Sequence, residues 1–156
     1  MQRVGALENG AQVYVDYAHT PDALETALRA IRPHVGGRLH LAFGAGGDLA
    51  HHGPLARVTV AAELADRVIV TDDNPRREDP ETIRRQILAT CSGAEDIGDR
   101  AKAIRASIAD LAEGDILMIS GKGHEQGQIV GLETLPFDDV DVAAGILSEM
   151  GGEVVA

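Results

Sequence analysis

The sequence predicts an α/β protein with three layers, in which helices cover both faces of a mostly parallel, Rossmann-like sheet and a small antiparallel hairpin lies at its edge. Short apolar runs at 39–43 (LHLAF), 67–71 (RVIVT) and 116–120 (ILMIS) are typical of strands buried on both faces. Longer segments with apolar residues at helical spacing lie between these runs, and such alternation favours a parallel sheet. With 156 residues, the chain is expected to form a single domain, 1–156, with a complete core.

The first half of the chain supplies three of the expected strands, at 12–17, 39–43 and 67–71. A helix is expected after the first strand, because Thr20 is a good N-cap and Pro21 suits the first helical position. Its apolar face consists of Leu24, Ala27, Leu28 and Ile31, and Pro33 with Gly36-Gly37 ends it. A weaker, alanine-rich helix is expected from 54 to 65.

The second half continues the alternation. Asp79 and Asp99 are the expected N-caps of two helices, and a short strand at 95–97 lies between them. The strand at 116–120 is followed by a hairpin at 128–135, broken at Gly131, and by a last helix at 139–150. Each of these three helices has an expected inward face. It consists of Ile83, Ile87, Leu88 and Cys91 in the helix after Asp79, of Ala101, Ile104, Ile108 and Leu111 in the helix after Asp99, and of Val142, Ile146, Leu147 and Met150 in the last helix.

Composition excludes several classes of function. The formal net charge of -11 argues against a surface for nucleic acid or anionic membranes, so an anionic ligand would need locally placed Arg or Lys. The single Cys91 permits no internal disulfide, suits a reducing compartment and is expected to be an inert core thiol. No apolar run approaches the roughly 18 residues of a membrane span and residues 1–3 do not open a signal peptide, so we expect a cytoplasmic protein.

The loop at 72–80 (DDNPRREDP), named the central loop here, is the most informative stretch of the chain. It follows a buried strand, and open α/β sheets bind ligands at the carboxyl ends of their strands. Asp73, Asn74 and Arg76 offer a carboxylate, an amide and a guanidinium, which is a set suited to a zwitterion. Pro75 stiffens the loop, because it fixes its own φ and restricts the residue before it.

Other polar loops follow neighbouring strands, at 18–22, 44–48 and 121–125. In a parallel sheet these loops share one edge, so their convergence predicts a binding site. The turn 44–47 (GAGG) lacks the third glycine of a dinucleotide fingerprint, since Leu49 stands in its place, and a close backbone approach explains it better. The segment 121–125 (GKGHE) is not a P-loop; it is either a turn with a solvated lysine or a site where Glu125 accepts from an ammonium and Gly121 exposes its backbone.

The histidines give no metal or catalytic pattern. His51 and His52 are adjacent, so they point in different directions, and no Cys or carboxylate has ligand spacing beside them. His34 and His40 have no identifiable partner, and nothing places a nucleophile in a strained turn.

Four of these stretches, taken together, carry a resemblance to a known family. Residues 15–24 (VDYAHTPDAL), 46–48 (GGD), 71–76 (TDDNPR) and 121–125 (GKGHE) occur in order and at familiar intervals. The chain thereby resembles the C-terminal domain of the Mur ligases, over essentially its whole length, and most closely the members that add diaminopimelate.

The resemblance implies an ATP-dependent amide-bond ligase of peptidoglycan synthesis, which joins meso-diaminopimelate to a UDP-N-acetylmuramoyl-dipeptide through an acyl phosphate. It assigns Asp73, Asn74, Pro75, Arg76, Gly121 and Glu125 to the amino-acid pocket and Asp16 and His19 to the nucleotide. A central domain would hold most of the ATP and Mg²⁺. Members that use lysine have Ala where Arg76 stands, so Arg76 favours diaminopimelate.

The chain departs from the family pattern in two ways. Leu49 replaces an arginine expected to bind a substrate carboxylate, in a loop at 49–54 that is one residue shorter, and Arg57 is a candidate substitute. No P-loop, acidic Mg²⁺ pair or UDP-sugar domain occurs in these residues, so the chain alone is not expected to turn over ATP. It is either an excised domain or a stand-alone relative. The alternatives are a degenerate, non-catalytic binding module and a domain of another amino-acid ligase, such as folylpolyglutamate synthase.

Overall fold

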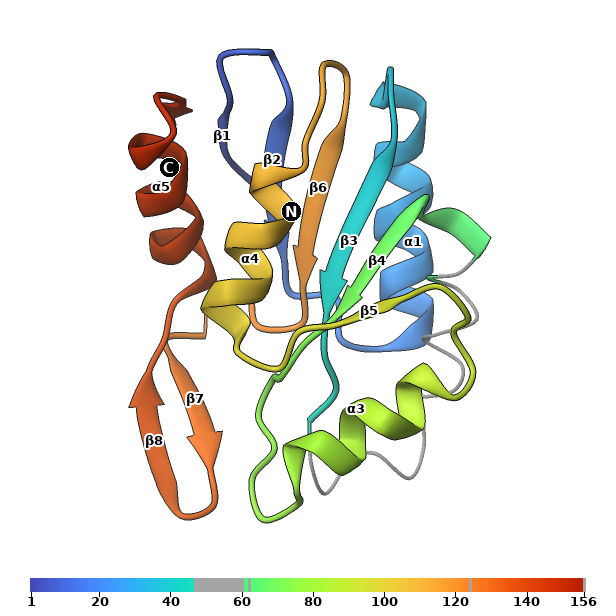
Figure 1. Ribbon diagram of the computed structural model, residues 1–156, viewed down its shortest axis with the longest axis vertical. Helices are drawn as coiled ribbons and strands as arrows, with labels where there is room; N and C mark the ends of the chain where they lie inside the picture. Colours follow the sequence, from blue (N-terminus) through green and yellow to red (C-terminus); the bar gives the residue numbers. More distant parts are fainter. Residues whose placement is uncertain (47–60, 62, 124, 156) are drawn as a thin grey trace.

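A computed structural model describes residues 1–46, 61, 63–123 and 125–155, and these form an α/β protein around a seven-stranded sheet (Figure 1). The elements of the described residues are β1 Gln2–Ala6, β2 Gln12–Asp16, α1 Pro21–Ile31, the 3₁₀ helix η1 Arg32–His34, β3 Leu39–Phe43, β4 Arg67–Val70, α3 Pro80–Leu88, β5 Glu95–Asp96, α4 Arg100–Ala109, β6 Ile116–Ser120, β7 Gly127–Val130, β8 Glu133–Pro136, α5 Asp139–Glu149 and β9 Glu153–Val154.

The strands of the large sheet are arranged in the order β5-β4-β3-β6-β2-β1-β9. The first five of these run parallel, whereas β1 pairs antiparallel with both β2 and β9. The carboxyl ends of β2, β3, β4 and β6 therefore lie at one edge, which is the lower edge of the large sheet in Figure 1. This confirms the predicted parallel sheet and the shared edge of its loops.

The sequence analysis did not predict two of the strands, β1 and β9. Only part of β1 is buried and β9 has two residues, so neither forms the continuous apolar run by which the central strands were predicted. Pairing with a neighbour, which a single segment does not reveal, makes them strands. Both extend the sheet on the side away from the central loop.

Helices cover both faces, as predicted. α1 and α3 pack on one face with Ile116 and Met118 of β6, whereas α4 and α5 pack on the other with Leu117 and Ile119. Such alternation along one strand is the expected result of the twofold side-chain period. The three-layer arrangement is therefore confirmed.

The predicted helix starts are correct, and the side chains that cap them hold them in place. Thr20, Asp79 and Asp99 each accept a hydrogen bond from the backbone N–H three residues on, at the starts of α1, α3 and α4. The apolar face of α1 is also confirmed, since Leu24, Ala27, Leu28 and Ile31 are all buried.

Other details of the helices differ from the prediction. Ala101 and Val142 are only half-buried, because the first turns of α4 and α5 direct Arg100 and Asp139 inward instead. Cys91 is buried but lies beyond the end of α3, and burial raises the pKa of its thiol. Most of the helix expected at 54–65 falls outside the described residues.

The predicted hairpin is present and forms its own two-stranded sheet, β7–β8, beside the central loop rather than extending the large sheet. Arg76 joins it through a parallel bridge to Val130. The Arg76 N–H donates to the Ile129 carbonyl at 3.0 Å, and the Gly131 N–H donates to the Arg76 carbonyl. The hairpin thus holds the backbone of the central loop.

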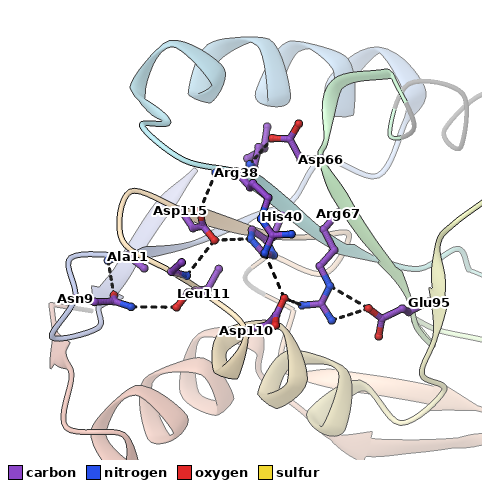
Figure 2. Close-up of polar contacts among 12 residues, drawn as sticks. Asn9, Ala11, Arg38, His40, Asp66, Arg67, Glu95, Asp110, Leu111 and Asp115 are labelled. Atoms are coloured by element: carbon purple, nitrogen blue, oxygen red, sulfur yellow. Dashed lines mark hydrogen bonds and ion pairs between the residues drawn. The ribbon is translucent and has the colours of Figure 1, made fainter.

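The opposite edge of the sheet, at the amino ends of the strands, carries a separate polar cluster (Figure 2). His40 Nε2 lies 2.8 Å from Asp115 Oδ2, and both side chains are buried, which supplies the partner that the sequence did not identify for His40. Burial favours a raised pKa for Asp115, but hydrogen bonds from the N–H groups of Arg38 and Ala112 and the contact with His40 outweigh it and lower that pKa.

None of the helices in the described part of the chain is long and apolar enough to cross a membrane.

Candidate functional site

A cleft of about 120 Å³ opens where the loops after β2, β3, β4 and β6 meet. Its lining residues are Tyr17, His19, Gly46, Asp73, Asn74, Arg76, Gly121 and Glu125. Most of the residues predicted for the site come together here. Pro75 and Asp16 do not line it.

The central loop reaches the cleft in a bent conformation. Arg76 has a φ of 54°, in the left-handed region that few residues other than glycine adopt. Its hydrogen bonds with the hairpin hold that conformation. A Cβ on Gly46 would lie 3.1 Å from Arg76 Nη1, so glycine at 46 leaves space for the guanidinium.

Asp73 faces the turn that follows β6. Gly121 has a φ of 120°, and a Cβ there would lie 2.9 Å from Asp73 Oδ2. Only glycine permits both the backbone conformation and this approach. Asp73 Oδ1 is buried and accepts no hydrogen bond from the described residues; its nearest cation is Lys122 Nζ, at 3.7 Å.

Lys122 is fully buried, so the alternative of a solvated lysine is wrong. Its ammonium donates a 3.0 Å hydrogen bond to Asn74 Oδ1 and lies 3.7 Å from Glu125 Oε2. Asn74 in turn accepts from the Ile129 N–H at 3.0 Å and donates from Nδ2 to Glu125 Oε2 at 3.2 Å. The turn after β6, the central loop and the hairpin are thereby tied together.

Asp72, the first residue of the central loop, does not take part in the cleft. Its carboxylate pairs with Arg84, whose Nε also donates to Asp96 Oδ1 at 2.6 Å. Burial raises the pKa of Asp72, and the Arg84 guanidinium offsets only part of that rise. Asp72 therefore fixes the loop to α3.

A buried ion pair lies beneath the site. Arg100 donates to both oxygens of Asp139 at 2.7 Å, and both side chains have no exposed surface. Its remaining donors reach the Asp72 carbonyl at 3.1 Å and the Ser120 carbonyl at 3.3 Å. Burial alone would lower the pKa of Arg100, but the Asp139 contacts outweigh it and raise that pKa. The pair thus holds the ends of β4 and β6 together.

The residues expected near a nucleotide lie at the β2 side of the cleft. His19 lines it, with its ring centroid 4.7 Å from that of Tyr17. Asp16 Oδ1 instead accepts from the Ala18 N–H at 2.7 Å, which fixes the turn out of β2. Pro75 lies behind the cleft, towards Pro80 and Ile83 of α3.

Sequence reasoning did not single out two of the residues at this site, Tyr17 and Lys122. Tyr17 ends the first predicted strand beside His19, and an aromatic side chain at that edge was an available signal. For Lys122 the flanking glycines were visible, but burial of its side chain depends on Asn74 and Asp73, about fifty residues away.

The cleft presents groups of both charges, so it can bind a polar ligand that carries a positive and a negative group. A guanidinium from Arg76 and carboxylates from Asp73 and Glu125 line the same space. In the part of the chain that the structure describes, no group of three His, Cys, Asp or Glu side chains could hold a metal ion.

Several residues considered from the sequence lie outside the described residues, namely Gly47, Asp48, Leu49, His51, His52, Arg57 and His124.

Comparison with known proteins places this geometry in a family context. Residues 1–123 match the family model described as "Mur ligase, glutamate ligase domain". A curated UDP-N-acetylmuramoyl-L-alanyl-D-glutamate–2,6-diaminopimelate ligase from Bradyrhizobium diazoefficiens is 57% identical over 148 residues, which are 95% of this chain and 30% of that protein.

Solved structures of related proteins have the same fold. A structure of a UDP-N-acetylmuramoyl-L-alanyl-D-glutamate–2,6-diaminopimelate ligase superposes with a TM-score of 0.89 at 35% identity, covering 97% of this chain and 32% of that one. A folylpolyglutamate synthase/dihydrofolate synthase from Yersinia pestis, complexed with AMPPNP and a manganese ion, shares the fold at a TM-score of 0.56 and 14% identity, over 90% of this chain and 28% of that one. The chain thus spans about a third of the length of these relatives.

Proposed function

The chain belongs to the family of Mur ligase glutamate ligase domains, and from that premise we propose that it is the amino-acid-binding C-terminal domain of a ligase that adds meso-diaminopimelate to UDP-N-acetylmuramoyl-L-alanyl-D-glutamate. The observation that carries the proposal is the presence of one guanidinium and two carboxylates around a single cleft, at Arg76, Asp73 and Glu125.

The distal end of diaminopimelate has one ammonium and one carboxylate, and each finds a partner of opposite charge. Asp73 and Glu125 present carboxylates that accept from the ammonium, and Gly121 lines the cleft beside them. Arg76 can hold the carboxylate with two parallel N–H···O bonds, which are strong and directional. With this end held, the other amino group of the ligand is left to react.

The rest of the reaction depends on parts of the relatives that this chain does not include. One synthase that shares this fold was solved with AMPPNP and a manganese ion bound. We assign ATP and Mg²⁺ mainly to a central domain of the complete ligase, with His19, and Asp16 behind it, facing the nucleotide.

A ligand panel tests the proposal by calorimetry on the chain. L-Lysine lacks the distal carboxylate of meso-diaminopimelate, and 2-aminopimelate lacks its distal ammonium. A lost charge-assisted contact is worth about 1.5–3 kcal/mol, so each analogue should bind roughly 10- to 150-fold more weakly than meso-diaminopimelate.

Matched variants test which residue recognises the carboxylate and which recognises the ammonium of the ligand. Arg76→Ala should abolish the preference over L-lysine, and Glu125→Gln should reduce the preference over 2-aminopimelate. Arg77→Ala is the control, because this neighbouring arginine is exposed and does not line the cleft. Equal affinity of the unmodified chain for all three ligands, or no binding of any, would refute the proposal.

A further inference from the structure

We propose that Lys122 is the positioning residue of the cleft: a buried counter-ion that sets the orientation of Asn74 and Glu125. This inference rests on the proposed function and assigns a role to a residue that does not itself line the cleft.

The burial of Lys122 calls for a physical explanation. Lysine is among the residues least often found fully buried, because removing an ammonium from water is costly unless it is paired and hydrogen-bonded. Here the compensation comes from Asn74 Oδ1 at 3.0 Å and from the carboxylates of Asp73 and Glu125, each at 3.7 Å. All three of these partners line the cleft.

The contacts of Lys122 fix the direction in which the Asn74 amide points. The oxygen of that amide accepts from both Lys122 Nζ and the Ile129 N–H. Its nitrogen is therefore directed to Glu125 Oε2, at 3.2 Å. Without the ammonium, one acceptor contact is lost and the amide is held less firmly. Lys122 thus acts on the ligand through Asn74 and Glu125.

The charges around Lys122 also favour this positioning role. Asp73 and Glu125 contribute two negative charges beside the single positive charge of Lys122. Arg100, which also faces these carboxylates, is already matched by Asp139. The ammonium of Lys122 therefore offsets part of the repulsion between these two carboxylates.

Calorimetry with meso-diaminopimelate tests the role through Lys122→Met, which keeps the length and apolar packing of the side chain but removes its charge. We expect a loss of affinity of at least about tenfold. Lys102→Met is the matched control, because Lys102 is the other lysine of the chain and is exposed on α4. It should bind like the unmodified chain.

A double-mutant cycle separates positioning from a purely structural effect. If Lys122 acts through Glu125, then Lys122→Met should cost little further affinity in a Glu125→Gln background. The side-chain amide resonances of Asn74 should also shift in Lys122→Met while the backbone resonances of the strands stay in place. Independent, multiplicative losses, or a Lys122→Met variant that binds within twofold of the unmodified chain, would overturn the inference alone.

The unmodified chain gives a test that does not depend on the folding of a variant. The Nζ protons of Lys122 should exchange slowly enough with water for their ¹⁵N signal to be seen, unlike those of Lys102. Equally fast exchange at both lysines would overturn the inference even if meso-diaminopimelate binds. Failure of the unmodified chain to bind any diamino acid would instead overturn the proposed function, and this inference with it.

Discussion

Substitution of Asp139 by Asn is expected to destabilise the fold strongly. Asp139 holds Arg100 with two 2.7 Å hydrogen bonds, and neither side chain has any exposed surface. The variant removes the carboxylate charge and leaves a buried guanidinium without its directly paired counter-ion. Breaking a buried pair in this way costs about 3–5 kcal/mol. For a domain of this size, that corresponds to a fall in Tm of roughly 6–20 °C.

Urea unfolding followed by far-UV circular dichroism measures this loss. Glu25→Gln is the control, because Glu25 and Arg29 form an ion pair of similar length, 2.8 Å, on the exposed surface of α1. It should change the free energy of unfolding by no more than about 0.5 kcal/mol.

Replacing both partners separates charge burial from packing. An Arg100→Met/Asp139→Leu double variant should recover much of the stability lost in Asp139→Asn, because no unpaired charge is left. A loss below about 1 kcal/mol in Asp139→Asn, with an unchanged m-value, would refute the argument that this pair holds the ends of β4 and β6 together.

Three further predictions concern stability and use the same unfolding assay. Folding lowers the pKa of Asp115, so its contribution to the free energy of unfolding is complete above the ordinary Asp pKa of about 3.9 and is lost as the pH falls below that value. Asp115→Asn should therefore flatten the decline of the unfolding free energy between pH 5 and 3. An unchanged slope would contradict this. Gly123→Ala should lower the free energy of unfolding more than Gly131→Ala. Both glycines have a positive φ, 54° and 63°, which costs alanine about 1–2 kcal/mol, but only at 123 would the new Cβ also meet another backbone. Equal losses would argue against a close approach at 123. Asp99→Ala should cost about 1 kcal/mol by removing the cap at the start of α4, and a neutral result would show that the 2.9 Å bond to the Lys102 N–H contributes little.

The parts of the fold that the sequence predicted are those decided by nearby residues. The start of α1 follows from Thr20 and Pro21, and β3 and β6 follow from five-residue runs in which four residues are apolar. The strand β1 was missed because its outer residues are exposed and its identity depends on pairing with β2. Local preference determines an element only where a buried face or a cap repeats within a few residues.

The candidate site shows the same division. The prediction that Arg76, Asp73 and Glu125 lie near one another is confirmed, because loops after parallel strands share an edge. The roles assigned to them remain predictions. The orientation of each side chain could not be predicted, since Asp72 turns to Arg84 while its neighbour Asp73 faces the cleft.

The sequence by itself determined the alternation of strands and helices, the helix caps and the edge of the sheet at which the polar loops gather, because these depend on periodicity and on residues adjacent in the chain. Only the tertiary structure decided which charges are buried. Arg100 meets Asp139, His40 meets Asp115 and Lys122 meets Asn74 across separations of 39, 75 and 48 residues. A charged side chain can be buried only where a distant segment supplies its partner, and that distance is set by the packing of the whole sheet.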